Sequence, residues 1–551
     1  MSSDRSRNVF EESDSPSRNA GGSDSIASGE GQCALSGPAG TNLPGGSVKS
    51  ESRSLWLHNG QCASGLDDCM QPWDQFRDLI VSAVRDGARV AALWARPLDV
   101  SLHSITAVLA YDADSMLRMA STTVGAEYPS LTPLCPEVHM FEREMWEQHG
   151  IVPVGHPWLK PVRFSRTGLN HAAQGPVSAA CGVTDFFRVD GAEVHEVAVG
   201  PVHAGVIEPG HFRFQCHGEK VFHLEISLGY QHRGVERALR GGPGRRSIHH
   251  VETLAGDTTI GHTIAYCSIL ESLAGVRVPP RAEVLRGIAL ELERVANHIG
   301  DLGALAGDVG FLPTQAYCGR LRGDALNLTA TLCGNRFGRG FVRPGGVAYN
   351  VDGAIFEDMK QRLRVLGRDT RNAVELLWSS PSVMARFDRT GVLGRTSCER
   401  LGIVGVAARA GGVARDVRRD FPSGIFCFAQ IPISGCDSGD VFARAYVRWL
   451  EVQRSMTFIQ EQLSSLPAGT IIEPVGQLRP DCAVVSLVEG WRGEICHAAV
   501  TDRDGRFAVY KVVDPSFHNW FGLAMALRNE QISDFPLCNK SFNLSYCGHD
   551  L

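Results

Sequence analysis

Hydrophobic residues recur every three to four positions over long stretches of the second half of the chain. Pro279 and Pro280 suit the start of a helix, and an apolar stripe follows them. The stripe consists of Leu285, Ile288, Leu292, Val295, Ile299 and Leu302. Weaker periodicity covers residues 355–377 and 441–463, while residues 484–488 and 508–513 have the pattern of strands. Beyond residue 190 the sequence therefore predicts a mainly helical domain with small β elements.

A different pattern covers residues 73–164. Short β-like runs at residues 90–94, 105–111 and 116–122 alternate with helical periodicity. In the stretch that begins at Glu137, Val138, Phe141 and Met145 share one helix face, and Gly150 is placed to end that helix. The fold class is therefore predicted to be α+β, with a small N-terminal α+β domain before the large, mainly α-helical one.

Composition changes along the chain suggest the domain boundaries. The first stretch, to about residue 52, is rich in Ser, Gly, Asp and Glu and cannot repay the entropy of ordering. We predict a disordered tail over residues 1–68, an α+β domain over 69–165, a linker over 166–190 and a helical domain over 191–551. The tail lacks the apolar core of a secretory signal, and its acidic residues argue against a transit peptide.

Charge and hydropathy exclude some classes of partner. The formal net charge is −6, and no block of consecutive basic residues occurs, so nucleic acid is not expected as a partner. The cluster Arg237, Arg240, Arg245 and Arg246 is broken by glycines and is interpreted as a solvated loop. The longest apolar stretch falls short of the roughly 20 residues that a spanning helix needs. No membrane-spanning segment is predicted.

The 16 cysteines are scattered, and no two are closer in sequence than Cys62 and Cys69. The chain therefore contains no CxxC pair. Without regular spacing or an export signal, the cysteines suggest a reducing cytosol in which most thiols are small buried hydrophobes.

Four stretches carry a resemblance to a known family. The first is GPVHAGVIEPGHFRF from Gly200 with LEISLGYQHRGVERAL from Leu224, and the second is AGDTTIGHTIAYCSILE from Ala255. The third is ELERVANHIGDLGALAGDVGF from Glu291 with RPGGV, and the fourth is VEGWRGEI from Val488 with DFPLCNKSFNLSYCGHDL. In this order they resemble the large subunit of group 4 membrane-bound nickel–iron hydrogenases, such as that of formate hydrogenlyase, and the 49 kDa subunit of complex I. EREMWEQHGIVPVGHPWL is similar to the 30 kDa subunit of complex I, fused here to the 49 kDa-like part.

The resemblance implies two cysteine pairs that would hold nickel, and both are absent. In place of the first pair the chain has Ala255 and Thr258, with His262 at the spacing of the family's histidine. In place of the second pair it has Ser545 and Gly548, and Cys547 lies one position away. Nickel bridged to iron needs soft thiolate donors. We therefore expect no metal bound by this chain, and we interpret Cys547 as a buried thiol.

The resemblance also assigns roles to other residues. Complex I uses the emptied cavity for quinone, which implies His203 and His211 in the loop and Asp308 as a partner of the histidine that would donate to a quinone oxygen. The family's tyrosine is not kept, since Gly256 stands at its position. Glu208 matches a proton-passing glutamate, for which a capping role remains equally open. Arg492 matches an arginine over the metal pocket.

Two further residues, His232 and Arg233, match a pair near the iron–sulfur cluster of the partner subunit, where positive charge raises the cluster potential. The implied catalytic set is thus Glu208, His211, Asp308 and Arg492, and the implied cofactor-binding set is His203, His232, Arg233 and His262.

Two functions remain open. The first is an electron-transfer subunit on the cytoplasmic face of the inner membrane, acting with a small 4Fe–4S subunit, antiporter-like membrane subunits and a quinone or other acceptor. The second is a non-catalytic coupling subunit that joins an electron-transfer arm to ion-translocating membrane subunits. A working hydrogenase would need ligands that the sequence lacks. NAD chemistry would belong to another subunit, since no glycine-rich phosphate loop is present.

Overall fold

The computed structural model describes residues 54–165, 181–203 and 207–551. Its first sheet has the strand order β1-β6-β5-β4, with β3 added in parallel to β6. Helix α1 covers the sheet and buries Phe76, Leu79 and Ile80. The elements are β1 (Leu55–Leu57), β3 (Met70–Gln71), α1 (Trp73–Arg85), β4 (Arg89–Pro97), β5 (His103–Tyr111) and β6 (Met116–Val124). The three predicted strands lie within β4, β5 and β6, and the α+β class is confirmed.

The folded region begins earlier than the sequence predicted. Strand β1 pairs with β6, and β2 (Ala63–Ser64) pairs with β14 (Cys482–Glu489), before the 3-10 helix η1 (Asp67–Cys69). The predicted tail is therefore wrong for residues 55–68, because short strands gain their order from distant pairing rather than from a local hydrophobic run. Its first 53 residues lie outside the described part of the chain.

Helix α2 (His139–His149) follows the 3-10 helix η2 (Pro136–Val138) and ends at Gly150. Gly150 adopts φ 73°, a left-handed conformation that suits glycine, as the sequence predicted. Strands β7 (Glu127–Pro129) and β8 (Val152–Val154) pair in parallel beside the helix. The glutamates of α2 are buried. Glu142 accepts hydrogen bonds from the backbone amides of Leu131 and Thr132, so its carboxylate contacts other residues of the same chain.

A three-stranded sheet in the order β11-β10-β9 comes next. It consists of β9 (Val194–Val199), β10 (His211–His217) and β11 (Lys220–Ser227). Of the predicted linker, residues 166–180 lie outside the described part, and residues 181–190 form neither helix nor strand.

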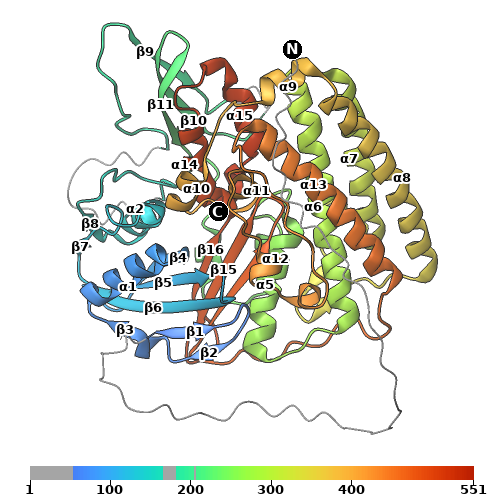
Figure 1. The fold of residues 1–551 in the computed structure, drawn as a ribbon. Coiled ribbons are helices and arrows are strands. Elements are labelled where there is room, and N and C mark those ends of the chain that lie inside the picture. The colour runs from blue at the N-terminus through green and yellow to red at the C-terminus, as the bar shows by residue number, and fades with distance from the viewer. Residues whose placement is uncertain (1–53, 166–180, 204–206) are drawn as a thin grey trace, which may run out of the picture. The chain divides into compact units, whose positions relative to one another are not determined.

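Long helices lie side by side in the remainder of the chain (Figure 1). They are α5 (Thr259–Ala274), α6 (Pro280–Asp308), α7 (Leu312–Cys333), α8 (Gly353–Trp378) and α13 (Val441–Ser464). Helix α6 starts after Pro279, and its predicted apolar stripe from Leu285 to Leu302 is fully buried. Burial of this stripe against α5, α7 and α13 makes α6 the centre of the helical part.

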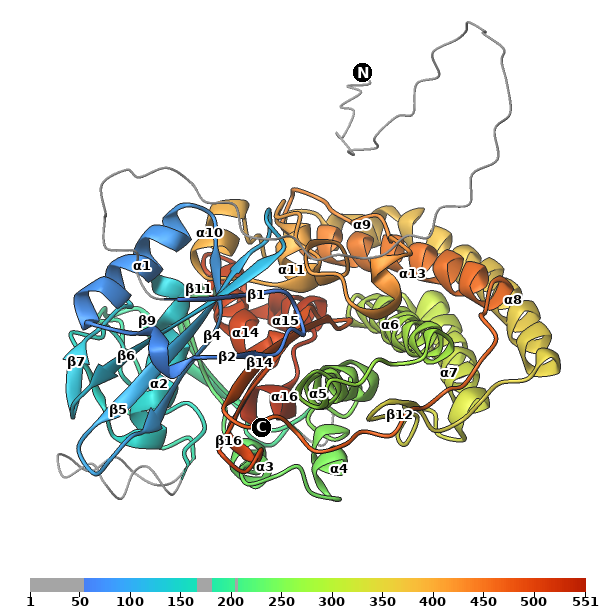
Figure 2. The same cartoon turned by 90° about the horizontal axis from the view of Figure 1, so that it is seen from below.

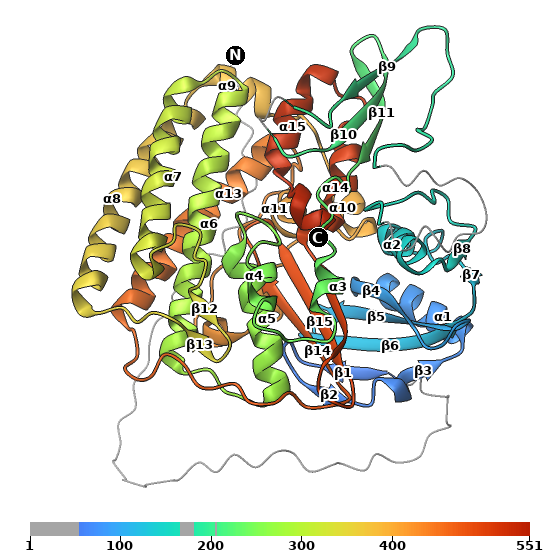
Figure 3. The ribbon, with the colours of Figure 1, turned by 180° about the vertical axis from the view of Figure 1, so that it is seen from behind.

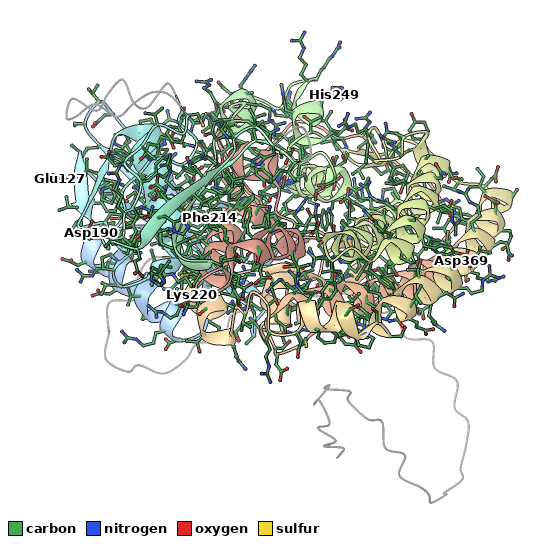
Figure 4. All side chains as sticks on the ribbon, turned by 90° about the horizontal axis from the view of Figure 1, so that it is seen from above. Glu127, Asp190, Phe214, Lys220, His249 and Asp369 are labelled. Atoms are coloured by element: carbon green, nitrogen blue, oxygen red, sulfur yellow. The ribbon has the colours of Figure 1, made fainter. Side chains whose placement is uncertain are left out.

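Shorter elements connect the long helices. They are α3 (Val235–Leu239), α4 (Ser247–Val251), β12 (Val342–Arg343), β13 (Gly346–Val347), α9 (Pro381–Phe387), α10 (Arg395–Arg400), α11 (Gly405–Ala410), α12 (Val417–Asp420) and η3 (Gly424–Cys427). His249 of α4 lies at the outer edge of the view in Figure 4. The α3–α4 loop exposes Arg240, Arg245 and Arg246, in agreement with the predicted solvated loop.

The C-terminal sheet has the strand order β16-β15-β14-β2. Its main strands are β14, β15 (Glu494–Thr501) and β16 (Phe507–Val513), followed by α14 (Pro515–Ala526), η4 (Ile532–Asp534), α15 (Phe535–Phe542) and α16 (Tyr546–Asp550). Strands β14 and β16 contain the predicted runs, whereas β15 was not predicted. Within the described residues, no helix has the length and apolar character needed to cross a membrane.

Candidate functional site

The motifs that carry the family resemblance lie at the starts of two helices and in the turn between two strands. Residues 255–258 precede α5, residues 545–548 begin α16, and Arg492 lies in the turn between β14 and β15. Helix α5 packs on β14 and β15, while α16 packs on α14; α5, α16 and β14 are neighbours in Figure 2. Five residues of these segments lie close together, and we call them the motif site: Asp257, Arg492, Asp514, Ser545 and Gly548.

An ion pair occupies one side of the motif site. The Arg492 guanidinium donates to both carboxylate oxygens of Asp257, at 2.6 and 2.7 Å. It also donates to Oγ1 of Thr258 at 3.2 Å and to the carbonyl of Asn543 at 2.5 Å, while stacking on the Trp491 ring. Burial alone would raise the pKa of Asp257, but the guanidinium outweighs it and lowers that pKa. Arg492 therefore ties the two motifs to each other.

On the other side, the second motif is closed against Asp514. A Cβ atom added at Gly548 would lie 2.6 Å from Oδ2 of Asp514. Oγ of Ser545 accepts a hydrogen bond from the Gly548 amide at 2.9 Å, so this serine caps α16. A cysteine at position 548 does not fit unless Asp514 moves, and the donors at these positions are unsuited to nickel.

The thiol of Cys547, next to Gly548, is half-buried, whereas the sequence predicted a buried thiol. Burial, with a further contribution from Glu208, raises its pKa to about 11, so the thiol is protonated at neutral pH. Among residues 54–165, 181–203 and 207–551, no group of three or more His, Cys, Asp or Glu side chains could hold a metal ion.

Glu208 also reaches the second motif. Its Oε2 atom accepts a hydrogen bond from the Tyr546 amide at 3.1 Å. The structure therefore brings Glu208 beside the start of α16 and next to Cys547, where its carboxylate acts as a local acceptor for the helix.

The two loop histidines are held by backbone groups. Nε2 of His203 lies 2.8 Å from the Gly210 carbonyl, and Nδ1 of His211 lies 3.0 Å from the Gly200 carbonyl. Arg213 donates to Nε2 of His211 at 3.3 Å, so both ring nitrogens of His211 are engaged. Asp308 ends α6, and partial burial raises its pKa to about 6. The structure thus does not join His211 to Asp308.

His232 and Arg233 hold the C-terminal residues. Nδ1 of His232 lies 2.7 Å from the Asp550 carbonyl. Arg233 donates to the carbonyls of Thr253, Leu254 and Cys547 at 2.6, 2.9 and 3.2 Å. Arg233 therefore links the segment before α5 to α16, and its side chain remains exposed on the surface.

His262 is completely buried and contacts Asp514 of the motif site. Its Nε2 atom is 3.0 Å from Oδ2 of Asp514, and its Nδ1 atom is 3.1 Å from Nε2 of His497. Nδ1 of His497 lies 2.9 Å from the Tyr510 hydroxyl. Of these four residues the sequence pointed only to His262, because the others come from strands and a helix start more than 200 positions away.

Comparisons with known proteins relate the chain to two kinds of subunit. The model of the respiratory-chain NADH dehydrogenase 49 Kd subunit matches residues 308–479, and that of the 30 Kd subunit matches residues 74–172. The carbon monoxide-induced hydrogenase of Rhodospirillum rubrum is 32% identical over 63% of this chain and 97% of its own length. Formate hydrogenlyase subunit 5 of Escherichia coli is 27% identical over 76% of each chain. NADH-quinone oxidoreductase subunit 4 of Thermus thermophilus is 29% identical over 62% of this chain and 90% of its own length.

Proposed function

The chain belongs to the family that joins hydrogenase large subunits to the 49 kDa subunit of complex I, with a 30 kDa-like part fused to it, and from this premise we propose that it passes electrons without a nickel centre. It is a subunit of a complex I-like or hydrogenase-related oxidoreductase. Its proposed electron partner is the 4Fe–4S cluster of a small neighbouring subunit, with a quinone or another acceptor reduced at the motif site.

One observation carries this proposal: charged side chains take the places around the former ligand positions. The Asp257–Arg492 ion pair lies beside Thr258, and the Asp514 carboxylate borders Gly548, two positions that match cysteines of hydrogenases in the sequence. These groups can orient a polar acceptor and supply hydrogen bonds, whereas they cannot hold a low-spin nickel–iron pair. The subunit is further proposed to sit peripherally on the cytoplasmic face of the membrane, against antiporter-like subunits.

Metal analysis of the purified complex tests the proposal. We expect nickel far below one atom per chain, and iron that leaves the preparation together with the cluster subunit. The carbon monoxide-induced hydrogenase of Rhodospirillum rubrum, purified in the same way, serves as the comparison. One nickel atom per chain in the complex would contradict the proposal.

A non-catalytic coupling subunit is the second candidate. Both nitrogens of His211 are already bonded, and Gly256 stands at the position of the family's tyrosine, which favours a site that reduces no quinone. Reduction of a soluble quinone analogue by the assembled complex, abolished by His211→Ala, would exclude this candidate.

A further inference from the structure

Four buried side chains are hydrogen-bonded in series behind the motif site. From the motif site inward they are Asp514, His262, His497 and Tyr510, joined by contacts of 3.0, 3.1 and 2.9 Å. All four are almost completely buried. They come from the start of α14, from α5 and from the paired strands β15 and β16. Helix α5 lies beside β15 in Figure 3. We call these residues the relay.

With both histidines neutral, an ionised Asp514 sets the direction of the relay. Burial raises the pKa of Asp514, but the hydrogen bond from His262 outweighs this effect, so the net pKa is lowered and the carboxylate accepts. With its proton on Nε2, His262 accepts at Nδ1 from Nε2–H of His497. His497 in turn accepts at Nδ1 from the Tyr510 hydroxyl. Every donor therefore points towards Asp514.

We propose that the relay delivers protons to the motif site. A proton arriving at the Tyr510 oxygen releases the hydroxyl proton to Nδ1 of His497. The Nε2 proton of His497 then passes to Nδ1 of His262, and the Nε2 proton of His262 passes to Asp514. Asp514 gives this proton to an acceptor in the motif site. One proton enters and one leaves, no electron moves, and both histidines finish neutral in the opposite tautomer.

The two ends of the relay lie where a proton route needs them. At the inner end, Oδ2 of Asp514 borders Gly548 of the second motif. At the outer end, the Tyr510 ring lies 6.0 Å from that of Tyr266, whose hydroxyl lies beside Ser247. Ser247 follows the exposed α3–α4 loop and accepts a hydrogen bond from Gly244. Proton entry is therefore proposed on the side of Tyr266 and Ser247.

The relay rests on the proposed reduction at the motif site, because reduction of a quinone or a similar acceptor consumes protons. It adds a route that uses none of the catalytic residues that the family resemblance implies. General acid–base groups contribute about 10²–10⁴-fold to a rate. Removal of a relay member is therefore expected to slow acceptor reduction by at least about tenfold.

Turnover of the assembled complex with a soluble quinone analogue gives the first test. His497→Ala is expected to slow reduction and to regain much of the rate when imidazole is added, since free imidazole can carry the proton. The matched control is His518→Ala, which removes a buried histidine outside the relay. Wild-type turnover in His497→Ala, or equal imidazole rescue in both variants, would overturn the relay.

Nitrogen NMR of the full chain with labelled histidines gives a test that needs no turnover. We expect His262 and His497 to carry their protons on Nε2, and Tyr510→Phe to shift the tautomer balance of His497. A proton on Nδ1 of His497 in the wild type overturns the relay. If the expected tautomers are seen in a complex that reduces no acceptor, the reduction proposed at the motif site is contradicted. The hydrogen-bonded order of the relay residues is then still supported.

Discussion

The Arg492 guanidinium and the Asp257 carboxylate form a two-fold hydrogen bond, at 2.6 and 2.7 Å, beside Thr258 at the start of α5. Arg492 also bonds the Asn543 carbonyl, and so it joins the start of α5 to the segment before α16. This pair therefore links the two motifs through charge.

Arg492→Met is expected to lower the free energy of unfolding by about 3 kcal/mol, because it leaves Asp257 without its counter-ion. Asp257 keeps 31% of its side chain exposed, which places the loss at the low end for a buried pair. Arg492→Met with Asp257→Leu should recover most of the loss in urea unfolding. Arg362→Met, which breaks a surface pair with Asp358, should change the stability by less than about 1 kcal/mol. Equal losses in the single and double variants would contradict this account.

Gly548→Cys is expected to destabilise the protein by about 1–3 kcal/mol, since the new Cβ atom would crowd Asp514. Gly256→Cys is the matched glycine control, because a Cβ atom there meets nothing within 4 Å. A variant with cysteines at positions 255, 258, 545 and 548 should therefore bind no nickel while Asp514 is present. Thermal unfolding and metal analysis measure the two effects. Full nickel loading of that variant would show that Asp514 does not close the site.

His518 predicts a dependence of stability on pH. Burial, with help from Arg89, lowers its pKa to about 3, so the folded protein cannot take up a proton that the unfolded chain takes up below about pH 6.5. Stability from this group is complete above pH 6.5 and falls by about 2 kcal/mol between pH 6.5 and 5. His518→Phe should remove this loss, whereas Phe517→Leu should keep it. Urea unfolding at pH 7 and pH 5 measures the difference, and parallel pH dependences of His518→Phe and the wild type would contradict it.

Glu144 connects the 30 kDa-like part to the C-terminal sheet. It accepts from Lys511 at 2.7 and 2.6 Å and also pairs with Arg163, all three being buried. Glu144→Gln is expected to cost about 3 kcal/mol, because the buried Arg163 loses its ion pair and Lys511 keeps only Glu236.

The control for Glu144 is Glu357→Gln, which loosens an exposed pair with Lys360 and should change stability by less than about 1 kcal/mol. Denaturant unfolding followed by tryptophan fluorescence measures both variants. We expect one transition in the wild type, and separate transitions of the two parts would contradict a tight junction.

The features that the sequence predicted well are those set by local pattern. The stripe from Leu285 to Leu302 predicted α6 because helix periodicity needs no distant partner. Strand β1 was missed, since three residues gain their order only by pairing with β6. At the motif site, the absence of two cysteine pairs could be predicted from the family resemblance, since the flanking motifs are present in the sequence. Asp514 and Tyr510 could not, because only the sheet brings them to His262.

The contact of Glu144 with Lys511 has a consequence for how such complexes are assembled. Separate subunits must meet by diffusion, and the occupancy of their junction depends on the abundance of each. A short tether raises the effective concentration of two binding surfaces to the millimolar range. In this chain both surfaces arise from one translation event in a fixed one-to-one ratio. The junction can therefore form at any expression level, and a change on one side can be compensated within the same gene.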